Sequence, residues 1–130
     1  MILSAPLELP RHSSLRVAVI VGKGRGLVAV GPIAEDELIE VAPVIPFREE
    51  DRPMPPSLLY GFAFHWPDPP FVEAMVLGAV SLVNHADDPN AWFEPSIEEQ
   101  ALRLWAGRDI AAGEEITIAY GIPLWFAPVA

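Results

Sequence analysis

The sequence predicts a single, mainly β domain, and three observations support this fold class. Apolar residues fall in short runs or alternate with polar residues, and glycine or proline bounds most of these runs. The 130 residues include 15 prolines, which interrupt most stretches long enough for a helix. Hydrophobic residues make up 52% of the chain, which is enough for one apolar core in a domain of this size.

The first third of the chain is expected to form strands joined by turns. Residues 17–21 and 27–30 are rich in valine and other apolar residues, so each predicts a short strand. The glycine-rich segment 22–26 between them predicts a tight turn. After a polar turn, a third strand rich in β-branched residues is predicted over residues 38–42.

The middle of the chain is less regular. Residues 46–57 combine prolines with a run of acidic residues, which predicts an exposed connection rather than a helix. Residues 58–66 are aromatic and apolar and predict one more strand, which the proline-rich segment 67–70 ends. Residues 71–83 are mostly apolar and fit either a strand or a short buried helix, because periodicity does not separate these alternatives.

Three further short strands are predicted toward the C-terminus. Residues 91–94 are a short, largely apolar segment, and residues 102–105 alternate in a way that is typical of a half-buried strand. Gly113 marks a turn before residues 116–118, where apolar and polar residues alternate again. Since no internal repeat is found, residues 1–130 are expected to form one domain.

Composition limits the classes of partner and site. The absence of cysteine excludes disulfides, thiolate nucleophiles and cysteine-ligated zinc. Neither an apolar run of the roughly 18 residues of a membrane helix nor a basic N-terminal leader is found, so we expect a cytoplasmic protein without membrane contact. A net charge of −10 argues against direct nucleic-acid binding and favours a basic protein or peptide partner, with acidity for solubility alone as the alternative.

Two short segments have the residue types of a binding site. Gly24 and Gly26 would let a ligand lie against the backbone, whereas a dinucleotide-binding loop is excluded because no third glycine opens a helix after them. The polar segment 84–90 follows a long apolar run with almost no transition. Its His85 has no histidine or cysteine partner nearby, so no metal site is predicted.

Together these segments resemble the SET-domain family. The resemblance is carried by the order and spacing of three patterns, which are Gly24-x-Gly26 with an apolar strand behind it, Asn84-His85 followed by Pro89-Asn90, and Gly113-Glu114-Glu115 leading to Tyr120-Gly121. They cover about residues 15–121, and residues 122–130 form a short aromatic tail.

The resemblance implies a fold and an activity. The expected fold is the β-clip-like arrangement of short strands in small curled sheets, with a C-terminal pseudoknot beside the cofactor. The expected activity is methyl transfer from S-adenosylmethionine to a lysine of a protein substrate. Such a reaction needs a neutral amine held in line with the methyl group, and a narrow apolar channel favours the neutral form of lysine.

The resemblance also implies which residues form the site. Tyr120 is expected to be catalytic, with Tyr60 as a second aromatic residue of the channel, although simple packing is the alternative role for Tyr60. Trp125 belongs to the aromatic tail, which we expect either to cover the site or to pack on the core or on a second copy in a homodimer. The residues expected to bind the cofactor are Lys23, Gly24, Arg25, Gly26, Asn84, His85, Tyr120 and Trp125.

Two other classes of function are kept as alternatives. A catalytically inactive SET fold would serve as a binding or dimerisation module, which the small size of the chain favours. A hydrolase is disfavoured, because no serine or cysteine nucleophile occurs in a recognisable motif.

Overall fold

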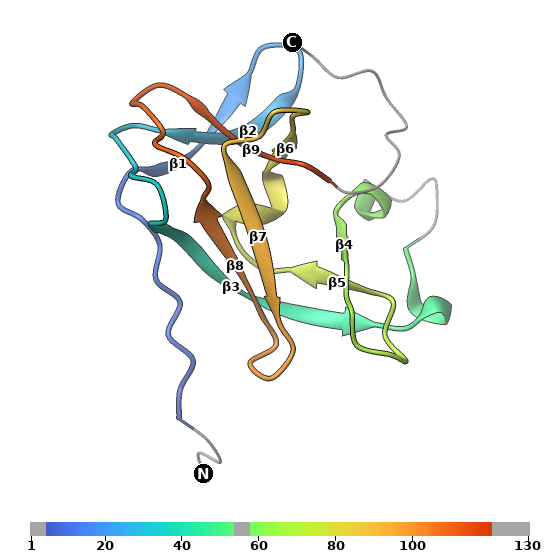
Figure 1. The fold of residues 1–130 in the computed structure, drawn as a ribbon. Helices are drawn as coiled ribbons and strands as arrows, with labels where there is room; N and C mark the ends of the chain where they lie inside the picture. The colour runs from blue at the N-terminus through green and yellow to red at the C-terminus, as the bar shows by residue number, and fades with distance from the viewer. Residues whose placement is uncertain (1–4, 54–57, 121–130) are drawn as a thin grey trace.

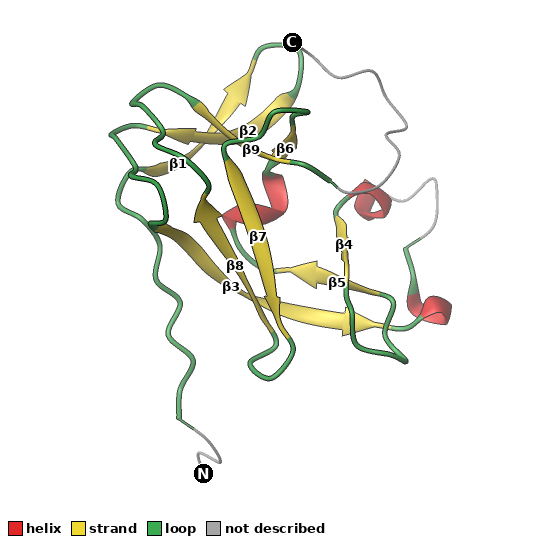
Figure 2. Ribbon diagram, viewed as in Figure 1, coloured by secondary structure: helices red, strands yellow, loops and turns green. Residues whose placement is uncertain are grey.

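The computed structural model describes residues 5–53 and 58–120, and strands dominate this part of the chain (Figures 1 and 2). The strands are β1 (Leu15–Ile20), β2 (Gly24–Ala29), β3 (Leu38–Phe47), β4 (Ala63–His65), β5 (Glu73–Val76), β6 (Asn84–His85), β7 (Ala91–Ser96), β8 (Ala101–Ala106) and β9 (Glu115–Ile118). Three short 3-10 helices accompany them, namely η1 (Glu49–Asp51), η2 (Leu58–Gly61) and η3 (Ala79–Leu82). Among the described residues, no helix is long and apolar enough to cross a membrane.

The strands form two sheets (Figure 1). The smaller sheet has the order β1-β2-β9-β6, and the larger one has the order β4-β5-β3-β8-β7. Neighbouring strands are antiparallel except for β6 and β9, which are parallel. The strand β9 therefore lies between β2, from the first part of the chain, and β6, from its second half. The mainly β class predicted from the sequence is confirmed.

The apolar core is built from both sheets and from the segments between them. Its largest fully buried side chains include Leu27 in β2, Leu104 in β8 and Ile116 in β9. The strand β8 is more buried than the half-buried strand predicted from alternation, because β3 and β7 flank it on both sides. The site described below rests on this core, since β2 and β9 contribute buried residues to it.

The strand β3 is longer than predicted. The sequence predicted a strand over residues 38–42, and prolines follow at positions 43 and 46. Instead, the first half of β3 pairs with β8 up to Pro43, and its second half pairs with β5 from Val44 onward. Proline has no backbone N–H to donate to a neighbouring strand. Pro43 lies where β3 changes partner from β8 to β5, so the missing donor falls at the end of one ladder rather than in its middle.

The two ambiguous apolar segments contain both kinds of structure. Residues 71–83 form the strand β5 and then the helix η3, so each of the two alternatives is correct for part of the segment. Residues 58–66 were predicted as a strand, but only β4 is extended, and η2 precedes it. The proline-rich connection contains the three-residue helix η1 where no helix was expected, and residues 54–57 lie outside the described part.

Candidate active site

Three segments that are far apart in the sequence meet around β9. Val28 of β2 lies opposite Glu115 on one side of this strand, and Asn84 of β6 lies opposite Thr117 on the other. The glycine-rich turn, the Asn-His pair and the C-terminal strand are therefore neighbours (Figure 1). The arrangement brings together all three patterns that were singled out in the sequence.

The side chain of Asn84 reaches across β9 toward the glycine-rich turn. Its Nδ2 donates to the backbone carbonyl of Arg25 at 3.2 Å and to Oε2 of Glu115 at 2.9 Å. A Cβ on Gly26 would lie only 2.5 Å from this nitrogen and 3.0 Å from Oε2 of Glu115. The position therefore requires glycine for close approach of two side chains. Gly24, by contrast, has open space around it and a φ of +82°, so it is required by the turn itself.

Lys23 is committed to an ion pair within this group. Its Nζ lies 2.9 Å from Oε1 of Glu115, and the two side chains are only 15% and 18% exposed. One carboxylate thus accepts from Lys23 with one oxygen and from Asn84 with the other. The sequence pointed to Lys23 as a cofactor residue, and the structure places its ammonium against a carboxylate of the same site.

His85 and Tyr120 form a second cluster at the other end of β6. The backbone N–H of Tyr120 donates to Nδ1 of His85 at 3.0 Å, and Nε2 of His85 lies 2.8 Å from Oδ1 of Asp87. Because Nδ1 accepts, Nε2 carries the proton and donates to Asp87. The two rings also meet edge to face at a centroid distance of 5.2 Å. Both ring nitrogens of His85 are therefore occupied by protein partners.

The phenol of Tyr120 is held from inside the fold. Its hydroxyl donates to the backbone carbonyl of Val83 at 2.9 Å. Burial raises the pKa of the Tyr120 hydroxyl above its usual value, and the negative charge of Glu115 adds to this shift, while a backbone hydrogen bond at His85 opposes it. The hydroxyl is therefore neutral at physiological pH, and besides donating to Val83 its oxygen takes part in the backbone hydrogen bond at His85.

Tyr120 also lines a cleft of about 800 Å³. The walls of this cleft are rich in aromatic side chains, and two of them, Phe64 and Phe93, pack edge to face with ring centroids 5.3 Å apart. The lining also includes the charged residues Arg52 and Glu73, which form an ion pair with each other at 2.6 Å. The remaining surface is largely apolar, so the cleft suits an uncharged or desolvated group better than a free cation.

Asn90 has a structural role that the sequence pattern did not reveal. Its side chain is buried, and its Nδ2 donates to the carbonyl of Glu115 at 2.8 Å while its Oδ1 accepts from the N–H of Thr117 at 2.9 Å. The Asn90 amide thereby replaces a strand partner for β9. The sequence identified Pro89-Asn90 as part of a motif, and an asparagine followed directly by an apolar strand was the only local signal.

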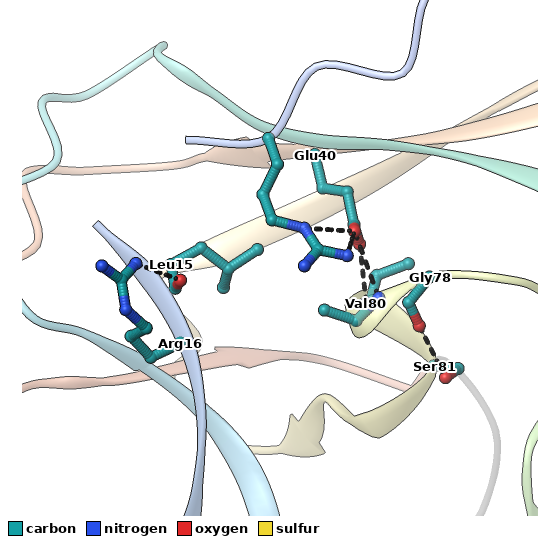
Figure 3. A network of polar contacts seen from close by, with 8 residues as sticks. Leu15, Arg16, Glu40, Gly78, Val80 and Ser81 are labelled. Atoms are coloured by element: carbon teal, nitrogen blue, oxygen red, sulfur yellow. Dashed lines mark hydrogen bonds and ion pairs between the residues drawn. The ribbon is translucent and has the colours of Figure 1, made fainter. Parts of the chain in front are cut away.

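Glu40 is a second residue whose role sequence reasoning missed (Figure 3). Its carboxylate is buried and accepts from Nη2 of Arg11 at 2.9 Å and from the N–H groups of Ala79 and Val80 at 3.1 and 2.8 Å. These two N–H groups open η3, which leads directly to Asn84. Glu40 therefore fixes the start of the segment that carries the Asn-His pair. The signal in the sequence that could have indicated this role was a glutamate within an otherwise apolar strand.

Two predicted residues are not placed by the structure, and no metal site is indicated. Tyr60 belongs to η2, and the neighbouring Gly61 lines the cleft, but the side chain of Tyr60 lies outside the described residues. Trp125 and the tail around it also lie outside them. Within residues 5–53 and 58–120, no group of three His, Asp or Glu side chains could hold a metal ion.

Comparisons with known proteins agree with this arrangement. The sequence pattern of the SET domain matches residues 24–121. The chain is 29% identical over 117 residues to a Schizosaccharomyces pombe protein named histone-lysine N-methyltransferase, H3 lysine-37 specific, and the match spans 88% of this chain and 78% of the relative. It is 36% identical over 64 residues to the Saccharomyces cerevisiae histone-lysine N-methyltransferase SET5, a match that spans 49% of this chain and 10% of that protein.

The fold has a counterpart among solved structures. The crystal structure of a proposed histone methyltransferase of Plasmodium falciparum matches 88% of this chain and 99% of its own, with a TM-score of 0.70 at 24% identity. A likeness at this identity supports the fold alone. It confirms the predicted class of short strands in curled sheets.

Proposed function

Because the chain belongs to the SET-domain family, we propose that it is a protein-lysine N-methyltransferase that uses S-adenosylmethionine. Members of this family use S-adenosylmethionine in general, and the two curated relatives are named histone-lysine N-methyltransferases. The observation that carries the proposal is the position of Tyr120. Its backbone is tied to His85 of the Asn-His pair, and its ring lines the aromatic cleft. A donor held on one side and an amine held on the other would meet at this residue.

The residues around β9 fit the donor. The NH₂ group of Asn84 is used by Arg25 and Glu115, so the Oδ1 oxygen of its amide remains an acceptor, and among the described residues no hydrogen bond reaches it. Such an oxygen suits the α-ammonium group of the cofactor. Gly24 leaves open space beside the backbone, which a ligand could approach closely. These residues, with the backbone of His85, are proposed to hold S-adenosylmethionine.

The chain's own groups would orient the lysine rather than act as a strong base. When bound, S-adenosylmethionine supplies a methyl group that is already activated by its sulfonium charge. Tyr120 is held by its hydrogen bond to the carbonyl of Val83 and lines the cleft, so its phenol would form the wall against which the lysine amine is positioned. The aromatic walls of the cleft disfavour the charged ammonium, whose ordinary pKa is near 10.4, and so favour the nucleophilic amine.

The substrate is proposed to be a basic protein or peptide. The net charge of −10 favours the approach of a basic partner. The names of the two relatives point in the same direction, because histones are basic. A cytoplasmic location and a homodimer remain predictions from the sequence alone.

Methyl transfer from labelled S-adenosylmethionine to histones and to lysate proteins tests the proposal. The wild-type protein is expected to label lysine, and Tyr120→Phe is expected to lose at least about tenfold in rate, because the hydroxyl that fixes Tyr120 at the cleft wall is gone. Val19→Thr, in an exposed part of β1 away from the cleft, is the matched control and should label as wild type does. Equal labelling by wild type and Tyr120→Phe would remove Tyr120 from the mechanism. A folded wild-type protein that neither binds the donor at millimolar concentration nor labels any substrate would favour the inactive module.

A further inference from the structure

The carboxylate of Glu115 lies at the meeting point of all three segments of the site. Oε1 accepts from Lys23 at 2.9 Å, and Oε2 accepts from Nδ2 of Asn84 at the same distance. The side chain is 18% exposed, and the ammonium of Lys23 balances its charge in this partly buried place. Glu115 therefore makes one directed hydrogen bond to each neighbouring motif, to Lys23 in the glycine-rich turn and to Asn84 in the Asn-His pair.

The chemistry of the two contacts on Asn84 determines which way its amide points. A carboxylate and a backbone carbonyl only accept hydrogen bonds, so both Glu115 and Arg25 must face the NH₂ end of the amide. The oxygen end is then turned the other way. With a neutral group in place of the carboxylate, the longer contact to the Arg25 carbonyl at 3.2 Å would remain to hold the NH₂ end, and the orientation would be less well defined.

We propose that Glu115, held by Lys23, is a positioning residue that fixes the Asn84 amide with its oxygen toward the cofactor, and so selects a ligand with an α-ammonium group. This inference rests on the proposed function for the identity of the ligand. The orientation of the amide itself does not depend on it. Glu115 acts through Asn84, so its loss should alter binding of the ammonium group more than binding of the rest of the ligand.

Glu115→Gln keeps the size of the side chain but can present an NH₂ group to Asn84, which leaves the Arg25 carbonyl to hold the amide in its present orientation. Glu114→Gln is the matched control, because Glu114 is the adjacent glutamate and its exposed carboxylate accepts from the N–H of Ala111 within the turn rather than from Asn84. The double variant Lys23→Met with Glu115→Gln separates the orientation of the Asn84 amide from the charge left on Lys23. If unbalanced charge on Lys23 were the sole cause of weaker binding, this double variant would recover.

Calorimetry with two ligands measures the selection. S-adenosylhomocysteine carries the α-ammonium group, and its deamino analogue does not. For Glu115→Gln, we expect the Kd of S-adenosylhomocysteine to rise about tenfold while that of the analogue changes less than about twofold, since one charged hydrogen bond is affected. Glu114→Gln should change neither. Equal weakening for both ligands, or full recovery in the double variant, would overturn the inference.

A spectrum of the ligand-free protein provides an independent test. The side-chain NH₂ signals of Asn84 in a ¹⁵N correlation spectrum should move in Glu115→Gln and stay in place in Glu114→Gln. Unmoved Asn84 signals would refute the orienting role of Glu115 whatever the ligand. If wild type bound neither compound while the Asn84 signals moved as expected, the proposed function would fail and the orienting contact would stand without its cofactor.

Discussion

Gly26→Ala is the substitution that tests the architecture of the site most directly. The added Cβ would lie 2.5 Å from Nδ2 of Asn84, 2.8 Å from Cγ1 of Ile20 and 3.0 Å from Oε2 of Glu115. Relief of the contact with Cγ1 of Ile20 requires a change of χ1 in this β-branched side chain. The Asn84 amide cannot move without lengthening its hydrogen bonds to Arg25 and Glu115. We therefore expect the methyl group to displace Asn84.

The magnitude follows from the contacts that would be lost. A hydrogen bond to a charged group contributes about 1.5–3 kcal/mol, and one between neutral groups contributes about 0.5–1.5 kcal/mol. If only the bond to Glu115 breaks, the free energy of unfolding should fall by roughly 2 kcal/mol. Displacement of Asn84 should also raise the Kd for S-adenosylhomocysteine at least about tenfold, the equivalent of about 1.4 kcal/mol.

Urea denaturation and calorimetry with S-adenosylhomocysteine measure the two effects, and two other glycines are the controls. Gly107→Ala should behave as wild type, because its Cβ would be 3.4 Å from Cδ1 of Trp92, an ordinary contact. Gly24→Ala should lose about 1–2 kcal/mol of stability from its positive φ while Asn84 stays in place. Wild-type affinity in Gly26→Ala would refute the claim that Asn84 needs this close approach to bind the donor.

Two further predictions concern Glu40 and Tyr120. Glu40→Ala should lower the free energy of unfolding by more than about 2 kcal/mol in urea, because it leaves two buried N–H groups of η3 unsatisfied. Arg11→Ala removes the counter-charge of the buried carboxylate but leaves both N–H donors in place, so it should cost less than Glu40→Ala. Folding raises the pKa of Tyr120, so the neutral phenol stabilises the folded state. This contribution should be complete below the pKa of unfolded tyrosine, near 10, and should be lost as the pH rises through the pKa of Tyr120 in the folded protein. An absorbance titration of phenolate in wild type and Tyr120→Phe measures this, and titration of Tyr120 below the ordinary tyrosine value would contradict it.

The parts of the fold that sequence predicted are those set by local chemistry. The hairpin of β1 and β2 follows from valine-rich runs around a glycine-rich turn, and the turn before β9 follows from Gly113. The length of β3 could not be predicted in this way. Its prolines argue locally against a strand, but its change of partner from β8 to β5 depends on residues far along the chain.

The candidate site shows the same division. The resemblance brought Asn84, His85 and Tyr120 together, and the structure places Tyr120 against His85, the chain neighbour of Asn84. It did not indicate that the imidazole of His85 is used to hold Tyr120 and Asp87. Nor did it reveal the pair of Lys23 and Glu115, which are 92 residues apart. A side-chain partner at such a separation leaves no trace in local composition or periodicity.

The position of β9 links the two halves of the proposed site. The strand carries Glu115 at its start, beside the glycine-rich turn, and leads to Tyr120 beside the aromatic cleft. Its register is fixed on one side by antiparallel pairing with β2 and on the other by parallel pairing with β6. A slip of one residue would turn each of its side chains to the opposite face and separate Glu115 from Asn84. The buried amide of Asn90, which bonds to Glu115 and Thr117 of the same strand, opposes such a slip. The distance between a bound donor and an incoming amine would thus be set by the register of one strand.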